Sequence, residues 1–157
     1  MHIENMLRVA DFLERQVDGC FNMSSWLFHK DIDLGDEEDS SSEMSARTAN
    51  RLRAHLIDKG TMEGCGTVAC IAGWTAFLFA KETVYDIESF AQETLGLSDE
   101  QINGPEGLGG LFYSGYSWPD GFGEKFDKAA TPAEKAKVAA AYMRHMVAQE
   151  QAALATA

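Results

Sequence analysis

The stretch GCGTVACIAGW, residues 64–74, leads into an uncharged run, TVACIAGWTAFLFA, at 67–80. A helix that is apolar on every face must be buried on every face. The length of the run favours a helix, although its β-branched and aromatic residues leave a strand as the alternative. We therefore expect a buried central helix at about 67–80, with Thr67 as its N-cap.

The two cysteines of this stretch are predicted to differ in reactivity. Cys65 would lie beside the unpaired amide groups at the helix start, where the pKa of a thiol is lowered. Cys70 falls inside the apolar run and is expected to be a buried, inert thiol. A nucleophilic cysteine also requires a base. His29 is one candidate, and the two histidines kept for a hypothetical catalytic set with Cys65 are His55 and His145.

Other interpretations of the stretch are structural. Its glycines allow a sharp entry into the helix, while small residues such as Ala72 and Gly73 provide a face for close packing. The spacing of Cys65 and Cys70 fits neither the zinc pattern nor the cysteine-protease string C-G-[SA]-C-[WY]. We therefore expect no metal and no cofactor.

Composition restricts the classes of partner. The 157-residue chain has 13 basic and 25 acidic residues, a net charge of -12. This charge repels a phosphate backbone, so direct nucleic-acid binding is not expected. The pattern predicts neither a signal peptide nor a membrane span, and three cysteines favour free thiols in the cytoplasm. The acidic balance indicates either solubility or a surface for a basic protein partner.

The remaining helices are predicted from apolar periodicity and from capping residues. Apolar spacing predicts a helix over 3–17, and the residues at 21–28 are too apolar for a solvated loop. The tail at 150–157 is expected to fray. The expected caps are Ser40 with Glu43 and Gly60, Asp86 with Gly96, Ser98 with Gln101, and Thr131-Pro132 with Glu134.

Two loops complete the predicted fold. The acidic segment 31–42 is expected to be mobile, and it does not fit a calcium loop because Gly35 and Ser42 stand at ligand positions. The segment 103–126, rich in glycine and aromatic residues, is expected to be irregular and anchored by its rings. The predicted fold class is all-α: a compact single-domain helical bundle, residues 1–157, around the central helix.

Several short motifs recur in one group of proteins. Phe21, Met23 and Trp26 form F-x-M-x-x-W, and C-G-T-x-x-C-x-A-G-W runs from Cys65 to Trp74. In these, and in Leu95-Gly96-Leu97, Leu111-Phe112 and Trp118-Pro119, the chain resembles a group of small, largely uncharacterised proteins of bacteriophages, mobile elements and bacteria. The resemblance implies a phage or mobile-element origin and a place in the host cytoplasm. It supplies no established activity or catalytic residue.

Charge and resemblance together favour a non-enzymatic accessory protein that binds and modulates a host protein, including host defence. The alternative is a cysteine-dependent hydrolase or transferase that uses Cys65 with a histidine base. The oligomeric state stays open. The residues expected to contact the host protein are Asp31, Asp33, Asp36, Glu37, Glu38, Asp39, Trp118 and Phe122.

Overall fold

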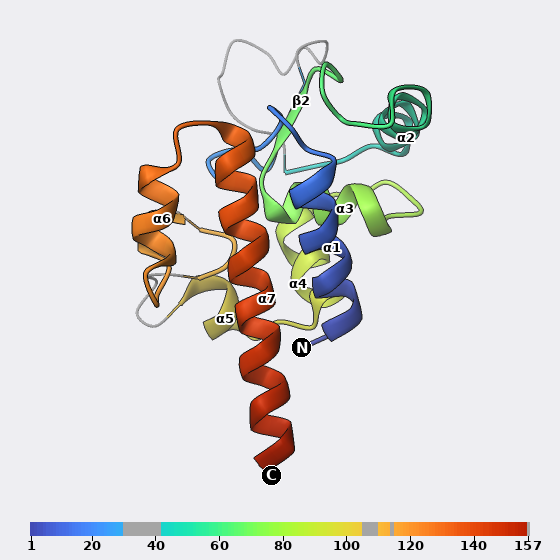
Figure 1. Cartoon of the computed structure of the whole chain (residues 1–157). Coiled ribbons are helices and arrows are strands. Elements are labelled where there is room, and N and C mark those ends of the chain that lie inside the picture. Colours follow the sequence, from blue (N-terminus) through green and yellow to red (C-terminus); the bar gives the residue numbers. More distant parts are fainter. Residues whose placement is uncertain (30–41, 105–109, 114, 157) are drawn as a thin grey trace.

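The computed structural model describes residues 1–29, 42–104, 110–113 and 115–156 (Figure 1). The chain is largely helical and also contains a small two-stranded sheet. No helix in these ranges is both long and apolar enough to cross a membrane. The elements are α1 (Ile3–Arg15), β1 (Leu27–His29), α2 (Ala46–Lys59), β2 (Thr67–Ala69), α3 (Ile71–Phe79), α4 (Ile87–Leu95), α5 (Asp99–Asn103), the 3-10 helix η2 (Gly115–Ser117), α6 (Phe122–Lys128) and α7 (Pro132–Thr156).

The expected helix at 67–80 is wrong at its N-terminal end, because residues 67–69 form strand β2. β2 pairs with β1 in antiparallel register, Leu27 opposite Ala69 and His29 opposite Thr67. The β-branched residues at 67 and 68 suit this extended conformation. Cys70 is the N-cap of α3, which begins one residue later, so Thr67 caps no helix. The all-α prediction therefore holds only as a largely helical fold.

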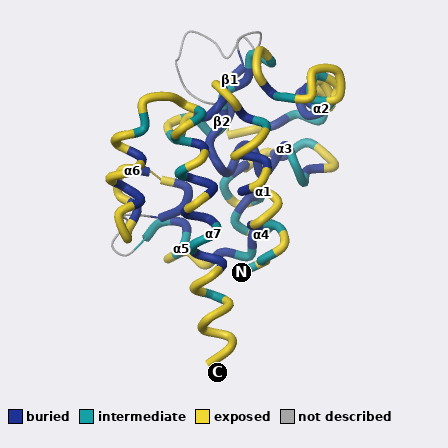
Figure 2. Tube along the Cα trace, in the orientation of Figure 1, coloured by how far each residue is buried: buried dark blue, intermediate teal, exposed yellow. Residues whose placement is uncertain are grey.

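Helix α3 is largely buried (Figure 2) and approaches the backbone of Trp26 closely. Its residues from Ile71 to Phe77 are buried. A Cβ added at Gly73 would lie 1.9 Å from the carbonyl oxygen of Trp26, so only glycine permits this approach. On another face, Trp74 is fully buried and its Nε1 donates to the carbonyl oxygen of Cys20 at 3.2 Å. Phe12, which falls outside the apolar stripe of α1, is covered by the Trp74 ring at 5.7 Å.

Helices α1 and α7 lie side by side (Figure 1). Arg144 of α7 bridges two carboxylates of α1, Asp11 at 2.8 Å and Glu14 at 2.7 Å. The C-terminal part of α7 extends beyond the rest of the molecule. The tail expected to fray is helical through Thr156, and its residues from 151 to 156 are exposed.

Most of the predicted helix ends are confirmed, because capping depends on neighbouring residues. The Asp86 side chain accepts from the Ser89 backbone N–H, and the Ser98–Gln101 capping box is present. Gly60 and Gly96 are left-handed C-caps. The predicted Ser40–Glu43 helix start is wrong, because α2 begins at Ala46. Its N-cap is Ser45, whose hydroxyl oxygen accepts from the Thr48 N–H. At the start of α7, Thr131 Oγ1 accepts from the Glu134 N–H and the Glu134 carboxylate accepts from the Thr131 N–H.

The glycine- and aromatic-rich segment is less irregular than predicted. It contains η2 and α6, which the sequence analysis missed. Its rings do anchor it, since Trp118 contacts the rings of Phe126 at 5.1 Å and Tyr142 at 4.9 Å. The part of the acidic loop at 31–41 lies outside the described residues.

The close contact at Gly73 generates a stability prediction. We expect Gly73→Ala to lower the free energy of unfolding by about 3 kcal/mol, because the new methyl group collides with a backbone carbonyl that cannot move cheaply. The measurement is urea denaturation followed by circular dichroism. The matched control is Gly60→Ala, where the methyl group meets nothing within 4 Å. Because the backbone of Gly60 is left-handed, we expect Gly60→Ala to lower the free energy of unfolding by a smaller amount, about 1 kcal/mol. Equal losses would contradict the packing argument.

Candidate thiol site

Two cysteines that are far apart in sequence meet at the end of the molecule near the sheet. The Sγ atoms of Cys20 and Cys65 lie 3.9 Å apart, and all three cysteines of the chain are free. Cys20 follows α1 and is buried, whereas Cys65 precedes β2 and is partly exposed. The pair therefore has one accessible sulfur and one shielded sulfur.

Backbone hydrogen bonds hold Cys20 in place. Its carbonyl oxygen accepts from the Ala69 N–H and from the Trp74 indole, each at 3.2 Å. Its N–H donates to the Val17 carbonyl oxygen at 2.8 Å. The Cys20 Sγ also lies 3.1 Å from the carbonyl oxygen of Met62, which is an alternative acceptor to Cys65 for the single hydrogen of the Cys20 thiol. These contacts leave Cys20 little freedom to move away from its partner.

Cys65 lies in a tight turn between two glycines. Gly64 and Gly66 both have positive φ, 71° and 77°, which other residues rarely adopt. The Cys65 N–H donates to the Met62 carbonyl oxygen at 3.1 Å. On the other side, the Cys65 carbonyl oxygen lies 3.1 Å from Nε2 of the buried His29. The glycines thus turn the chain so that the sulfur of Cys65 faces Cys20.

The surroundings of Cys65 favour its thiolate. The hydrogen bond from the Cys20 thiol is the largest cause that lowers the pKa of Cys65, to about 6. Partial burial opposes this shift, while the N–H of Thr67, which donates to Sγ at 3.2 Å, and its hydroxyl support it. The nearby positive field of His55 makes a smaller contribution in the same direction. Cys65 therefore carries a negative charge at neutral pH.

Cys20 has the opposite character. Its hydrogen bond to Cys65 is the main cause that raises its pKa, and burial and the negative charges of Cys65, Glu63 and Asp18 act in the same direction. A raised pKa at one sulfur and a lowered pKa at the other mean that the pair shares a single proton, held on Cys20. Cys65 is therefore the sulfur of the pair that ionises first, and Cys20 is the sulfur that keeps the proton.

Thr67 adds an unused donor to the site. Its side chain is buried, with 1% of its surface exposed. In the part of the chain that the structure describes, its Oγ1 has no hydrogen-bond partner of standard geometry. A buried hydroxyl without a partner carries a free-energy cost. The Thr67 hydroxyl nevertheless lowers the pKa of Cys65, so it acts on the Cys65 sulfur without a hydrogen bond of standard geometry.

The structure separates the candidate histidine bases. His55 lies close enough for its charge to act on Cys65, but its Nε2 is 2.9 Å from the Glu63 carbonyl oxygen. Among the described contacts, neither nitrogen of His55 bonds the Cys65 sulfur. His145 lies on α7, where its Nε2 pairs with Asp120 at 2.9 Å. A Cys65–His145 pair is therefore not formed.

Cys70 and the aromatic contact residues are buried. Burial raises the pKa of Cys70 to about 11, as expected for an inert thiol. Trp118 and Phe122 are 3% and 9% exposed and pack against Tyr142. Their rings pack inside the fold and leave little exposed surface, and their assignment as contact residues stays a prediction. The acidic residues predicted as contacts, 31–39, lie outside the described residues.

The sequence analysis missed the role of Cys20. Cys20 and Cys65 are separated by 45 positions, and no short motif signals their approach. The signal that was present is the glycine on each side of Cys65, which indicated a special turn. Among the described residues, no group of three or more His, Cys, Asp or Glu side chains is arranged to hold a metal ion.

The low pKa of Cys65 can be tested by alkylation. We expect the rate at which iodoacetamide modifies Cys65 in the reduced protein to rise with pH and reach half its maximum near pH 6. Cys20→Ala removes the hydrogen-bond donor and should move this midpoint upward, toward the ordinary value of about 8.5. Peptide mass spectrometry measures the rate at each cysteine. Cys70→Ala is the matched control and should leave the midpoint unchanged; an ordinary midpoint in the unmodified protein would contradict the electrostatic account.

Comparison of the chain with protein-family models, with curated proteins and with solved structures finds no match.

Proposed function

We propose that this protein carries out reversible thiol–disulfide exchange, with Cys65 as the attacking thiolate and Cys20 as the resolving thiol. The observation that carries the proposal is the 3.9 Å separation of the two sulfurs, one accessible and one shielded. A disulfide bond is about 2.05 Å long, so the sulfurs have to approach by about 1.9 Å. A rotation of the partly exposed Cys65 side chain supplies a movement of this size.

The first step is attack on an external disulfide. The Cys65 thiolate attacks one sulfur of a substrate R–S–S–R′, and the S–S bond of the substrate breaks as the Cys65–S–R bond forms. The electron pair leaves with R′–S⁻. At neutral pH Cys65 is already ionised because its pKa is about 6, so this step needs no separate base.

The second step uses Cys20. Once Cys65 is in a mixed disulfide it no longer bears charge or accepts a hydrogen bond. This removes the largest cause of the raised pKa of Cys20 and the contribution of the Cys65 charge, while burial of Cys20 remains. Cys20 then releases its proton to the departing R′–S⁻ or to water. Its thiolate attacks the Cys65 sulfur, and R–S⁻ leaves. In sum, the two cysteines lose two electrons and one proton, and the substrate disulfide takes up both electrons and the proton to leave as one thiol and one thiolate.

The hydrolase or transferase alternative has weaker support. Acyl transfer requires a base that takes up and returns a proton beside the nucleophile. His55 is hydrogen-bonded to the Glu63 carbonyl oxygen, and His145 is paired with Asp120. Exchange uses only the two sulfurs, which makes it the better supported reaction.

The binding of a host protein stays a prediction. It now rests on the net charge, on the acidic residues 31–39 and on the resemblance to phage and mobile-element proteins. A thiol-exchange role and a host-protein role are compatible if the substrate disulfide belongs to a protein.

The order of the two steps is tested with oxidised glutathione and single cysteine variants. We expect the reduced protein to form a Cys20–Cys65 disulfide. Cys20→Ser should stop at the mixed disulfide of glutathione with Cys65, because no resolving thiol is present. Cys65→Ser should react much more slowly, since burial and a raised pKa keep Cys20 protonated. Intact mass and peptide mapping without reductant identify each product.

Cys70→Ser is the matched control for this experiment and should give the same disulfide as the unmodified protein. A disulfide that includes Cys70, or a stable mixed disulfide on Cys65 while Cys20 is present, would contradict the proposal.

Disulfide formation should also stabilise the fold. The bond closes a loop of about 46 residues, which the chain-entropy relation values at about 4 kcal/mol before any strain. For a chain of this length, 2–4 kcal/mol corresponds to a rise in Tm of about 5–15 °C. Calorimetry of the oxidised and reduced protein measures the difference. The same treatment of Cys65→Ser should produce no rise, and an oxidised form that melts lower than the reduced form would argue against native-like geometry at the pair.

A further inference from the structure

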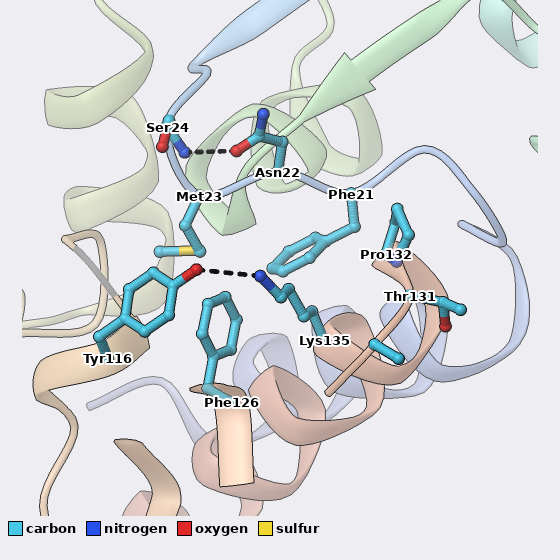
Figure 3. A pocket seen from close by; sticks show the side chains of 10 residues that line it. Phe21, Asn22, Met23, Ser24, Tyr116, Phe126, Thr131, Pro132 and Lys135 are labelled. Carbon is cyan, nitrogen blue, oxygen red and sulfur yellow. Dashed lines mark hydrogen bonds between the residues drawn. The ribbon is translucent and has the colours of Figure 1, made fainter. Parts of the chain in front are cut away.

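A cavity lies away from the thiol pair. It occupies about 250 Å³ between the residues at 21–24, η2, α6 and the start of α7 (Figure 3). Cys65 is not among its lining residues. In Figure 3 the side chains of Lys135 and Tyr116 point toward one another, with the rings of Phe21 and Phe126 beside them. Four parts of the chain thus build this cavity.

The polar groups at its centre are hydrogen-bond donors. Lys135 Nζ donates to the Tyr116 hydroxyl oxygen at 3.0 Å. The Tyr116 hydroxyl hydrogen and the two other ammonium hydrogens of Lys135 then stay available. The Lys135 ammonium also lies 5.2 Å and 5.1 Å from the ring centroids of Tyr116 and Phe126. The two rings hold the ammonium in place by cation–π attraction.

The cavity differs in charge from the rest of this acidic chain. None of the described residues that line it carries a carboxylate, and Lys135 is the charged residue among them. The neighbouring Glu134 is turned to the backbone, since its Oε2 accepts from the N–H groups of Ala130 at 2.7 Å and Thr131 at 3.1 Å. In a protein of net charge -12, a cavity with a cation and without an acid selects an anionic group.

The walls of the cavity determine the shape and polarity of the uncharged part of the ligand. Phe21 and Phe126 are almost fully buried and offer aromatic carbon, and Met23 and Pro132 add aliphatic surface. Aromatic rings pack on one another by edge and offset contacts. Sites for drug-sized ligands measure roughly 300–1,000 Å³, so this cavity suits a smaller molecule.

We propose that this cavity binds a small aromatic carboxylate, whose carboxylate accepts hydrogen bonds from Lys135 and Tyr116 and whose ring lies against the lining side chains of Phe21, Met23 and Pro132. The proposal is independent of the thiol chemistry, because no cysteine takes part in it.

The test is a titration of the reduced protein with benzoate, followed by ¹⁵N chemical shifts. We expect saturable binding with a Kd on the order of 1 mM, as suits a ligand of about nine heavy atoms. Lys135→Met keeps the length of the side chain and removes its charge, and it should weaken binding at least about tenfold, the effect of losing one charge-assisted bond. Tyr116→Phe should weaken binding by a smaller factor.

The matched control is Lys137→Met, an exposed position two residues further along α7 that changes the net charge equally. Lys137→Met should bind benzoate as the unmodified protein does. All of the variants should have a Tm within a few degrees of that of the unmodified protein. Three further ligands separate the contributions. Benzyl alcohol has the aromatic ring without a charge, and benzylamine has the ring with a positive charge. Inorganic phosphate has the negative charge without a ring.

Three outcomes would overturn the proposal: no saturation at concentrations roughly tenfold above the expected Kd, equal binding by Lys135→Met, or equally tight binding of benzylamine. Phosphate binding as tightly as benzoate would overturn the aromatic assignment.

Discussion

Strand β2 is hydrogen-bonded by residues of the segment that follows α1, and the positions of both candidate sites depend on this pairing. The Ala69 N–H donates to the Cys20 carbonyl oxygen, and the Ala69 carbonyl oxygen accepts from the Asn22 N–H, each at 3.2 Å. One residue later, the Cys70 N–H donates to the Ser25 carbonyl oxygen at 2.8 Å. Because buried backbone groups must be paired, these bonds oblige residues 20–29 to run alongside 67–70. Gly73 then allows α3 to pack against the same segment.

The thiol pair follows from that arrangement. With the Cys20 carbonyl oxygen bonded to Ala69 and Trp74, Cys20 is held beside the end of β2 and the first turn of α3, with its Sγ 3.9 Å from that of Cys65. The turn at Gly64 and Gly66 brings Cys65 to the same place. The proton that the two sulfurs share stays on Cys20, which lowers the pKa of Cys65 and raises the pKa of Cys20. The reactivity proposed for Cys65 thus depends on its partner sulfur and on Thr67, whereas the sequence analysis attributed it to a helix N-terminus.

The aromatic-rich segment contributes packing on one side and a cavity on the other. Trp118 and Phe122, predicted as contact residues, point into the core and stack on Tyr142 of α7. Tyr116 of the same segment is 54% exposed and meets Lys135 at the cavity. Large rings in a glycine-rich sequence can serve either purpose, because composition gives their number and not the direction in which each one points.

The sequence by itself determined the features that depend on neighbouring residues. Asp86, Gly96 and the Ser98–Gln101 box were identified correctly because a cap forms between groups two to four positions apart. The apolar run from Ile71 likewise predicted a buried helix segment, and its burial is observed. Only the tertiary structure decided that residues 67–69 form a strand, that Cys20 meets Cys65 and that Lys135 meets Tyr116. Each of these contacts joins residues well separated along the chain, and no local pattern specifies which distant segment will satisfy a given backbone or side-chain group.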